Sequence, residues 1–167
     1  MNFFSFIFFL FFFHISLNVH AGKGSVTGLE IPRFVSLKSN DVNLRIGPSK
    51  NYPILIKYTE KNLPIEIIEE FDVWRKTRDF ENNEGWIHKS LIKGDRYVII
   101  NNKSVINENI FNRPNGQAIA MIGQKNIIKL DKCLLDWCHV YHKKIKGWIL
   151  KKNLWGVYSK ETFNINY

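Results

Sequence analysis

The 167-residue sequence predicts an all-β protein built from two small, similar β-barrels in tandem, after an N-terminal signal peptide. Three observations lead to this fold class. A glycine-tryptophan-isoleucine phrase occurs twice, at residues 85–87 and 147–149. Turn-forming Gly, Pro and Asn residues recur about every ten residues, as in proteins with many short strands. No segment shows the apolar period of 3.6 residues that marks an amphipathic helix.

Residues 1–21 are typical of a secretory signal peptide. An apolar block runs from Phe3 to Phe13, and it is shorter than the roughly 20 residues that a membrane-spanning helix needs. Val19 and Ala21 then supply the small side chains of a cleavage site. We expect cleavage after Ala21 and a mature protein in the periplasm. A retained signal anchor is the alternative, because no Lys or Arg precedes the block.

The basic charge of the chain is concentrated in its second half. The sequence has 24 Lys and Arg against 15 Asp and Glu, a formal charge of +9. Residues 98–167 hold 11 basic and 4 acidic side chains, whereas residues 22–97 hold 13 and 11. Nucleic acid is the usual partner of such a surface, but export argues against it. We expect peripheral contact with an anionic membrane surface, lipopolysaccharide phosphates or cell-wall carboxylates.

Further motifs define the repeat around the two glycine-tryptophan-isoleucine phrases. An N-[L/I]-x3-P motif recurs after 66 residues, an I-x-[I/L] pair followed by tryptophan after 63, and G-W-I after 62. The first copy therefore has extra residues within "SKNYPIL" and "DFENNE", where we place loops. We assign residues 34–97 to barrel 1, residues 98–158 to barrel 2 and residues 159–167 to a tail.

Short alternating segments supply the strands of each copy. Residues 65–67 alternate as Ile-Glu-Ile, and residues 137–142 place His139 on the face opposite Cys138 and His142. Residues 97–100, "YVII", join the two copies without flexible Gly/Ser composition. This junction reads as a strand, and we expect it to be stiff and shared by both copies.

Three phrases of the first copy resemble the bacterial Src-homology-3-like (SH3b) domain. They are "VNLRIGPSKNYPI", "PIEIIEEFDVWRKTRD" and "EGWIHKSLIKG". The segment "DKCLLDWCHVYHKKIKGWILKKNLWGVY" is similar to the degenerate partner repeat of exported two-repeat members. The resemblance covers roughly residues 34–158. It implies two tandem small SH3-like β-barrels, often associated with the cell wall, with no catalytic activity of their own and no cofactor.

Eukaryotic relatives bind polyproline helices in an aromatic groove, and the resemblance locates the corresponding positions here. Trp74 and Trp137 match the groove tryptophan, but His88 replaces the groove proline and Leu91 the groove tyrosine. We therefore do not expect polyproline binding. Trp74 and Trp137 are either half-exposed platforms for a peptide or sugar, or hydrophobic caps over the barrel ends.

A shaped turn in the first copy supplies further candidates. Gly47 allows positive φ and Pro48 fixes the next φ, while Arg45 either ties this loop to the barrel through backbone carbonyls or binds ligand. Tyr52 lies in the extra residues of the loop and is a candidate contact residue. The candidate ligand-binding residues are therefore Arg45, Tyr52, Trp74, His88 and Trp137.

The repeated phrase itself is expected to be structural. Trp86 and Trp148 each follow a glycine and precede an isoleucine, and we place both in the core or at barrel closure, with Gly85 and Gly147 beside them. Two groups of lysines flank the second phrase and form either an anion-facing basic patch or a solvated hairpin tip. The candidate patch comprises Lys143, Lys144, Lys146, Lys151 and Lys152.

Cys133 and Cys138 flank a four-residue turn, which brings two strand ends to bridging distance. In an oxidising compartment a disulfide is the default. Two alternatives are a zinc site with His139 and His142, whose C-x4-C-H-x2-H spacing matches no common zinc module, and a Cys138 nucleophile. We expect no metal and no catalytic residue, because strand alternation separates Cys138 from His139.

These observations favour a non-catalytic exported binding module of the bacterial cell envelope. Its expected partner is a cell-wall component, such as peptidoglycan or its stem peptides, or an envelope protein. The alternative is a structural or adaptor protein that docks a partner without a small ligand.

Overall fold

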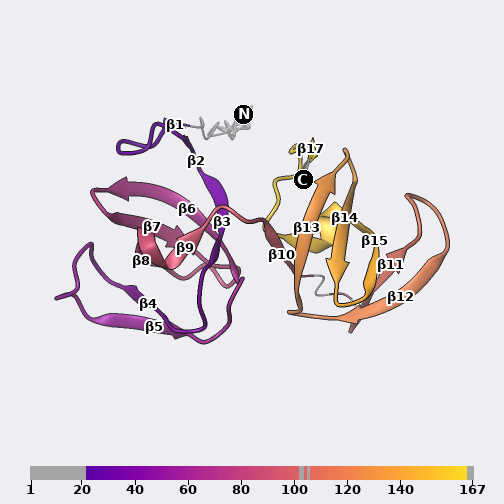
Figure 1. Cartoon of the computed structure of the whole chain (residues 1–167), viewed down its shortest axis with the longest axis horizontal. Coiled ribbons are helices and arrows are strands. Elements are labelled where there is room, and N and C mark those ends of the chain that lie inside the picture. Colours follow the sequence, from indigo (N-terminus) through magenta and orange to yellow (C-terminus); the bar gives the residue numbers. More distant parts are fainter. Residues whose placement is uncertain (1–21, 102–103, 105, 165–167) are drawn as a thin grey trace, which may run out of the picture.

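The structure is a computed structural model that describes residues 22–101, 104 and 106–164. The predicted signal peptide, residues 1–21, lies outside the described residues. The prediction of an all-β fold is confirmed: strands form a seven-stranded sheet, an eight-stranded sheet and a short two-stranded hairpin (Figure 1). Within the described ranges, no helix is long and apolar enough to cross a membrane.

The first repeat is a seven-stranded antiparallel sheet with the order β5-β4-β8-β7-β6-β3-β9. A one-turn 3-10 helix, η1 (Lys89–Leu91), precedes its last strand. The strands are β3 (Arg33–Leu37), β4 (Val42–Arg45), β5 (Ile54–Tyr58), β6 (Pro64–Phe71), β7 (Trp74–Arg78), β8 (Glu84–His88) and β9 (Ile92–Lys93).

The second repeat has the equivalent order, β12-β11-β15-β14-β13-β10-β16, and β17 adds to β13. Here η2 (Lys151–Asn153) corresponds to η1. The strands are β10 (Tyr97–Ile100), β11 (Asn107–Phe111), β12 (Ala118–Gly123), β13 (Ile127–Cys133), β14 (Trp137–His142), β15 (Ile145–Leu150), β16 (Leu154–Trp155) and β17 (Phe163–Asn164). Register shifts occur at equivalent points of β6 and β13, so the duplication extends to the β-bulges.

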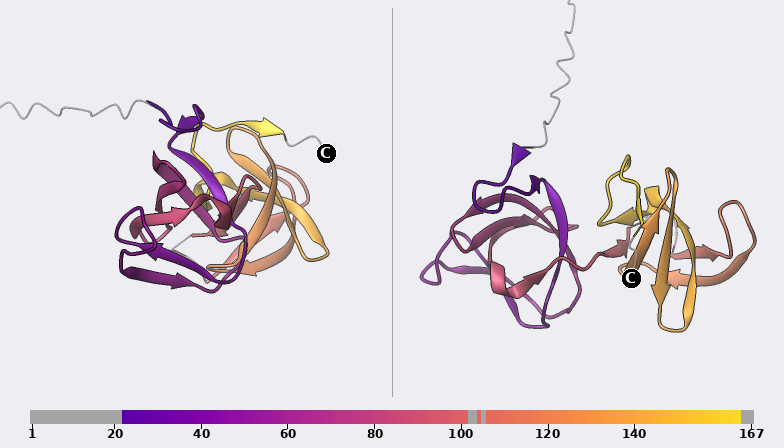
Figure 2. Two further views of the ribbon diagram at one scale, coloured as in Figure 1. Left: turned by 60° about the vertical axis from the view of Figure 1, so that its left-hand side comes forward. Right: turned by 45° about the horizontal axis from the view of Figure 1, so that its top comes forward.

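Each sheet curls around its own core (Figure 2). The alternation of Ile65 and Ile67 places both side chains inward, as their spacing predicts. The repeated glycines sit where strands approach closely. A Cβ at Gly85 would lie 2.7 Å from the carbonyl oxygen of Arg45, and one at Gly147 would lie 2.6 Å from that of Phe111. Any other residue at these positions would push the strands apart.

Strand β10 joins the repeats and contributes to both cores. Val98 and Ile100 face the second core, whereas Ile99 is 2% exposed and belongs to the first. Phe34 packs edge-on against Trp155 at 5.0 Å between ring centroids. The expected shared junction is confirmed, because the side chains of β10 serve both repeats in alternation.

An N-terminal hairpin of β1 (Gly22–Lys23) and β2 (Glu30–Ile31) is held against the first repeat by one buried carboxylate. Glu70 accepts hydrogen bonds from the backbone N–H groups of Val26 and Thr27 at 3.0 and 2.8 Å and from the Thr27 hydroxyl at 2.7 Å. Arg33 and Arg75 form ion pairs with it at 2.7 and 3.4 Å.

Candidate functional site

The strongest candidate site is a groove of about 570 Å³ on the second repeat. It is formed where the β13–β14 turn, η2 and the segment after β16 meet. Its lining combines apolar walls with an acidic and two basic side chains. The lining residues are Asn115, Leu135, Asp136, Trp137, Leu150, Lys151, Lys152, Leu154, Val157 and Ser159.

Trp137 forms one wall of the groove at the first position of β14. The ring is partly exposed and meets Phe111 edge-on, with 5.3 Å between centroids. Leu150 lies opposite it in the β14–β15 register, so the two side chains share a face. An aromatic ring held by an edge contact presents a rigid surface for an apolar or planar group.

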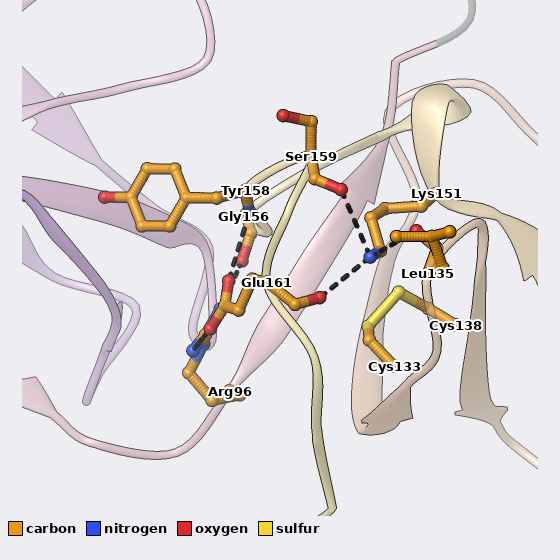
Figure 3. The surroundings of a disulfide bond; sticks show 9 residues. All are labelled: Arg96, Cys133, Leu135, Cys138, Lys151, Gly156, Tyr158, Ser159 and Glu161. Carbon is orange, nitrogen blue, oxygen red and sulfur yellow. Dashed lines mark hydrogen bonds and ion pairs between the residues drawn. A yellow bond between two sulfur atoms is a disulfide. The ribbon is translucent and has the colours of Figure 1, made fainter.

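Lys151 is a structural part of the groove rather than a free cation. It is 4% exposed, and its Nζ donates to the carbonyls of Leu135, Ser159 and Glu161 at 2.6, 3.3 and 2.7 Å (Figure 3). Burial lowers the pKa of Lys151, although Asp136 and Glu161 act in the opposite direction. The lysine thus ties the β13–β14 turn to the C-terminal segment.

A disulfide joins Cys133 and Cys138 (Figure 3). It closes the turn that carries the groove's Leu135 and Asp136. The predicted pairing is confirmed. The two cysteines are register partners on β13 and β14, and the Leu134 N–H donates to the Trp137 carbonyl at 2.8 Å. The two sulfur atoms are bonded to each other. The zinc hypothesis therefore lacks its thiolate ligands, and the nucleophile hypothesis lacks a free thiol.

The equivalent position in the first repeat is covered. Trp74 is only 8% exposed and meets His88 edge-on at 5.4 Å. His88 caps η1, since its Nδ1 accepts from the backbone N–H of Ser90 at 3.3 Å. Of the two alternatives for Trp74, the structure agrees with the hydrophobic cap and not with the half-exposed platform, because the ring lies below the surface beside the capping histidine.

The shaped turn of the first repeat holds itself together. Arg45 donates to the carbonyl of Tyr52 at 2.8 Å, as the structural alternative predicted. Gly47 does not adopt positive φ, and Pro48 follows it in the turn. A Cβ at Gly47 would come within 2.6 Å of the Tyr52 ring, so any other residue there would displace this ring. Tyr52 itself remains 45% exposed, but it belongs to a different repeat from Trp137.

A family model described as the bacterial SH3 domain matches residues 38–94 and 107–156. The chain belongs to the bacterial SH3 domain family. The two matched segments follow the two structural repeats, as the predicted tandem requires. Among curated proteins, none matches the chain. Bacterial SH3 domains are in general binding modules, which agrees with a groove built from apolar walls and fixed polar groups.

The repeated tryptophans of this SH3 pair do not occupy the cores, so the first of the two predicted placements, core or barrel closure, is wrong. Trp86 and Trp148 are partly exposed on the outer sheet faces, where they meet Phe71 and His139. Strand alternation explains the difference, because the flanking glycine and isoleucine of each phrase point inward.

The predicted basic patch of the SH3 pair is divided. Lys143 and Lys144 lie at the exposed β14–β15 turn, and Lys146 follows them at the start of β15. Lys151 and Lys152 lie beyond the other end of that strand, about 20 Å away for six extended residues. Only Lys152 of the second pair is exposed. The five lysines therefore do not form one patch.

Sequence reasoning missed the part of the groove contributed by the turn. Leu135 is 67% exposed and Asp136 follows it between the two cysteines. The signal was the phrase "LLDW" itself, since two leucines in a four-residue turn have no core to enter.

Proposed function

We propose that this protein is an exported, non-catalytic binding module of the bacterial cell envelope, and that the groove beside Trp137 receives its ligand. One observation carries the proposal. Trp137 lines a groove of about 570 Å³, whereas its counterpart Trp74 is 8% exposed. In this proposal each of the two sheets forms a small SH3-like barrel, and the first barrel stabilises the second by packing against it.

The chemistry of the groove favours a short peptide that carries both charges. Trp137 and Leu150 provide apolar contact, while Asp136 and Lys152 supply one acidic and one basic side chain. The stem peptides of peptidoglycan offer amine and carboxylate groups within a few residues of each other. The disulfide and the buried Lys151 fix the groove before binding, which reduces the entropy cost of association.

The proposed location is the periplasm, after cleavage of the signal peptide at Ala21. The support is the apolar N-terminal block of the sequence and the basic excess of residues 98–167, with 11 basic and 4 acidic side chains. An anionic envelope attracts such a surface and raises the rate of encounter.

Retention on purified, insoluble cell wall tests the proposal. We expect salt-sensitive retention of the wild type and about tenfold weaker binding of Trp137→Leu, because a buried aromatic contact carries a large share of binding energy. Tyr52→Leu is the matched control, since it removes a partly exposed ring from the first repeat. No retention of the wild type, or equal loss for the two variants, rejects the wall-binding groove.

The adaptor role is the second candidate, and one observation favours it. Strand β12 ends the sheet order of the second repeat, and its Ile119 and Met121 are 52% and 71% exposed. An apolar edge strand is suited to pairing with a strand of a partner protein. Capture of an envelope protein that Met121→Lys abolishes and Trp137→Leu preserves supports this role over wall binding.

A further inference from the structure

On the outer face of each repeat, three neighbouring strands contribute two side chains each. These six side chains form a grid of two rows, and the grid occupies equivalent positions in the two repeats. In the first repeat the rows pair Glu66 with Arg78 and Glu84, and Glu69 with Lys76 and Trp86. In the second repeat the strand register gives the equivalent rows. They contain Lys129, Tyr141 and Lys146, followed by Lys132, His139 and Trp148.

The grid of the first repeat neutralises itself. Lys76 lies 3.8 Å from both Glu69 and Glu84. Arg78 forms ion pairs with Glu84 at 2.7 Å and with Glu66 at 3.3 Å. Every charged position of this grid therefore has an opposite charge on a neighbouring strand, and the surface has little left to offer a charged ligand.

The grid of the second repeat has the opposite chemistry. All three glutamates are replaced by lysines, and the arginine and lysine between them are replaced by Tyr141 and His139. The rings are contiguous: His139 lies 5.3 Å from Tyr141 and 5.1 Å from Trp148 between centroids. Lys132 lies over the Trp148 ring at 5.6 Å.

A carboxylate next to the central ring of this surface is already engaged. Asp131 sits at the β-bulge of β13 and is 9% exposed, and its Oδ2 lies 2.8 Å from Nδ1 of His139. A bulge places two consecutive residues opposite one on the partner strand. Asp131 thereby orients the central ring of the cluster, and Lys132, beside it, faces the same surface.

We propose that this face, made of Lys129, Lys132, His139, Tyr141, Lys146 and Trp148, is a binding platform for an anionic polysaccharide. The grid spans about 10 Å across the strands and about 7 Å along them, the footprint of one or two sugar rings. Tyr141, which is 38% exposed, and the partly exposed Trp148 offer aromatic surface to the apolar sides of the sugars. Lys132 and Lys146 bind their carboxylate or phosphate groups, while Lys129 borders the platform near Asp95.

The platform adjoins the groove but does not depend on it. Trp137, His139 and Tyr141 alternate along the same face of β14, so the platform begins one row of side chains away from Trp137 of the groove. Surfaces that combine aromatic rings with lysines also bind single-stranded nucleic acid. The inference rests on the proposed envelope location only for the choice of a polysaccharide over such a nucleic acid. A ligand with neither sugar rings nor charge has no counterpart on this surface.

Titration of the full mature chain with alginate oligosaccharides, followed by tryptophan fluorescence, tests the platform. Lys132→Glu with Lys146→Glu is expected to weaken binding at least about tenfold, and Tyr141→Ser about fivefold. The matched control is Lys50→Glu with Lys61→Glu, which makes the same charge change at exposed positions of the first repeat. Trp137→Leu is expected to bind alginate normally, which separates this site from the groove.

Three comparisons decide the nature of the ligand. Neutral dextran is expected not to bind, and polyglutamate of equal charge is expected to bind at least fivefold more weakly than alginate, because it has no sugar rings for the aromatic face. Oligodeoxythymidylate binding as tightly as alginate overturns the polysaccharide assignment. Equal weakening by the control lysine pair, with unfolding temperatures unchanged in all variants, overturns the platform itself.

Discussion

Replacing Glu70 by glutamine tests how the N-terminal hairpin is held to the first repeat. The carboxylate is 5% exposed and accepts from Val26, Thr27 and Arg33. Glutamine has nearly the same shape, but its amide NH2 is a donor and meets donors already in place. The substitution therefore removes the charge and leaves buried N–H groups without an acceptor, with little change in volume.

The pKa of Glu70 gives the magnitude. Burial raises the pKa of this carboxyl, but hydrogen bonds from Arg33, Thr27 and Val26 lower it by more, from the ordinary 4.5 to about 2. Each pH unit between these values corresponds to about 1.4 kcal/mol, so the ionised carboxylate contributes about 3 kcal/mol. Because the folded pKa is the lower one, this stability is fully present above about pH 4.5 and is lost as the pH falls through about 2.

Urea unfolding measured between pH 7 and pH 2 is the assay. We expect Glu70→Gln to lower the free energy of unfolding by about 3 kcal/mol at pH 7 and to flatten its decline between about pH 4.5 and 2. Glu30→Gln is the control, because Glu30 is an exposed carboxylate of the same hairpin. A Glu70→Gln protein that keeps the wild-type pH dependence refutes the assignment of this carboxylate as the anchor.

Three further changes probe the rest of the fold. Replacing Cys133 and Cys138 by serine is expected to cost about 2 kcal/mol, the entropy of a short closed loop, and unfolding curves with and without reductant check it. Gly85→Ala and Gly147→Ala are each expected to cost at least about 1 kcal/mol in thermal unfolding, because the new Cβ meets a backbone carbonyl; a neutral effect contradicts the close approach. Ile99→Ala is expected to cost about 2–4 kcal/mol and to loosen both repeats together, which hydrogen exchange measures; faster exchange in one repeat alone argues against a shared core.

Periodicity and spacing were sufficient to predict the strands and the disulfide. Ile65 and Ile67 alternate with polar residues and point inward as predicted, and Cys133 and Cys138 pair because a short hairpin brings them together. The phrase Gly-Trp-Ile led to a wrong core placement of its tryptophans, because it contains no polar residue that would indicate which position faces solvent. Close packing of the strands at Gly147 requires glycine inside, and this sends Trp148 outward.

The groove could not be predicted from the sequence because it depends on segments brought together by folding. Asn115, the β13–β14 turn and Val157 meet at one place only after the sheet has curled. Lys151 was misassigned for a related reason. A lysine in a charged run is usually solvated, but here three backbone carbonyls converge on its ammonium group.

The most direct measurement of where this protein binds is an NMR titration of its backbone amides and indole N–H groups. The probe is a soluble peptidoglycan fragment composed of a disaccharide and its stem peptide. We predict that the largest shift changes occur at the Trp137 indole and at the amides of Asp136, Leu150 and Lys152. Changes confined to Tyr52 and the rest of the first repeat, or no saturable change at any residue, would contradict a ligand groove on the second repeat.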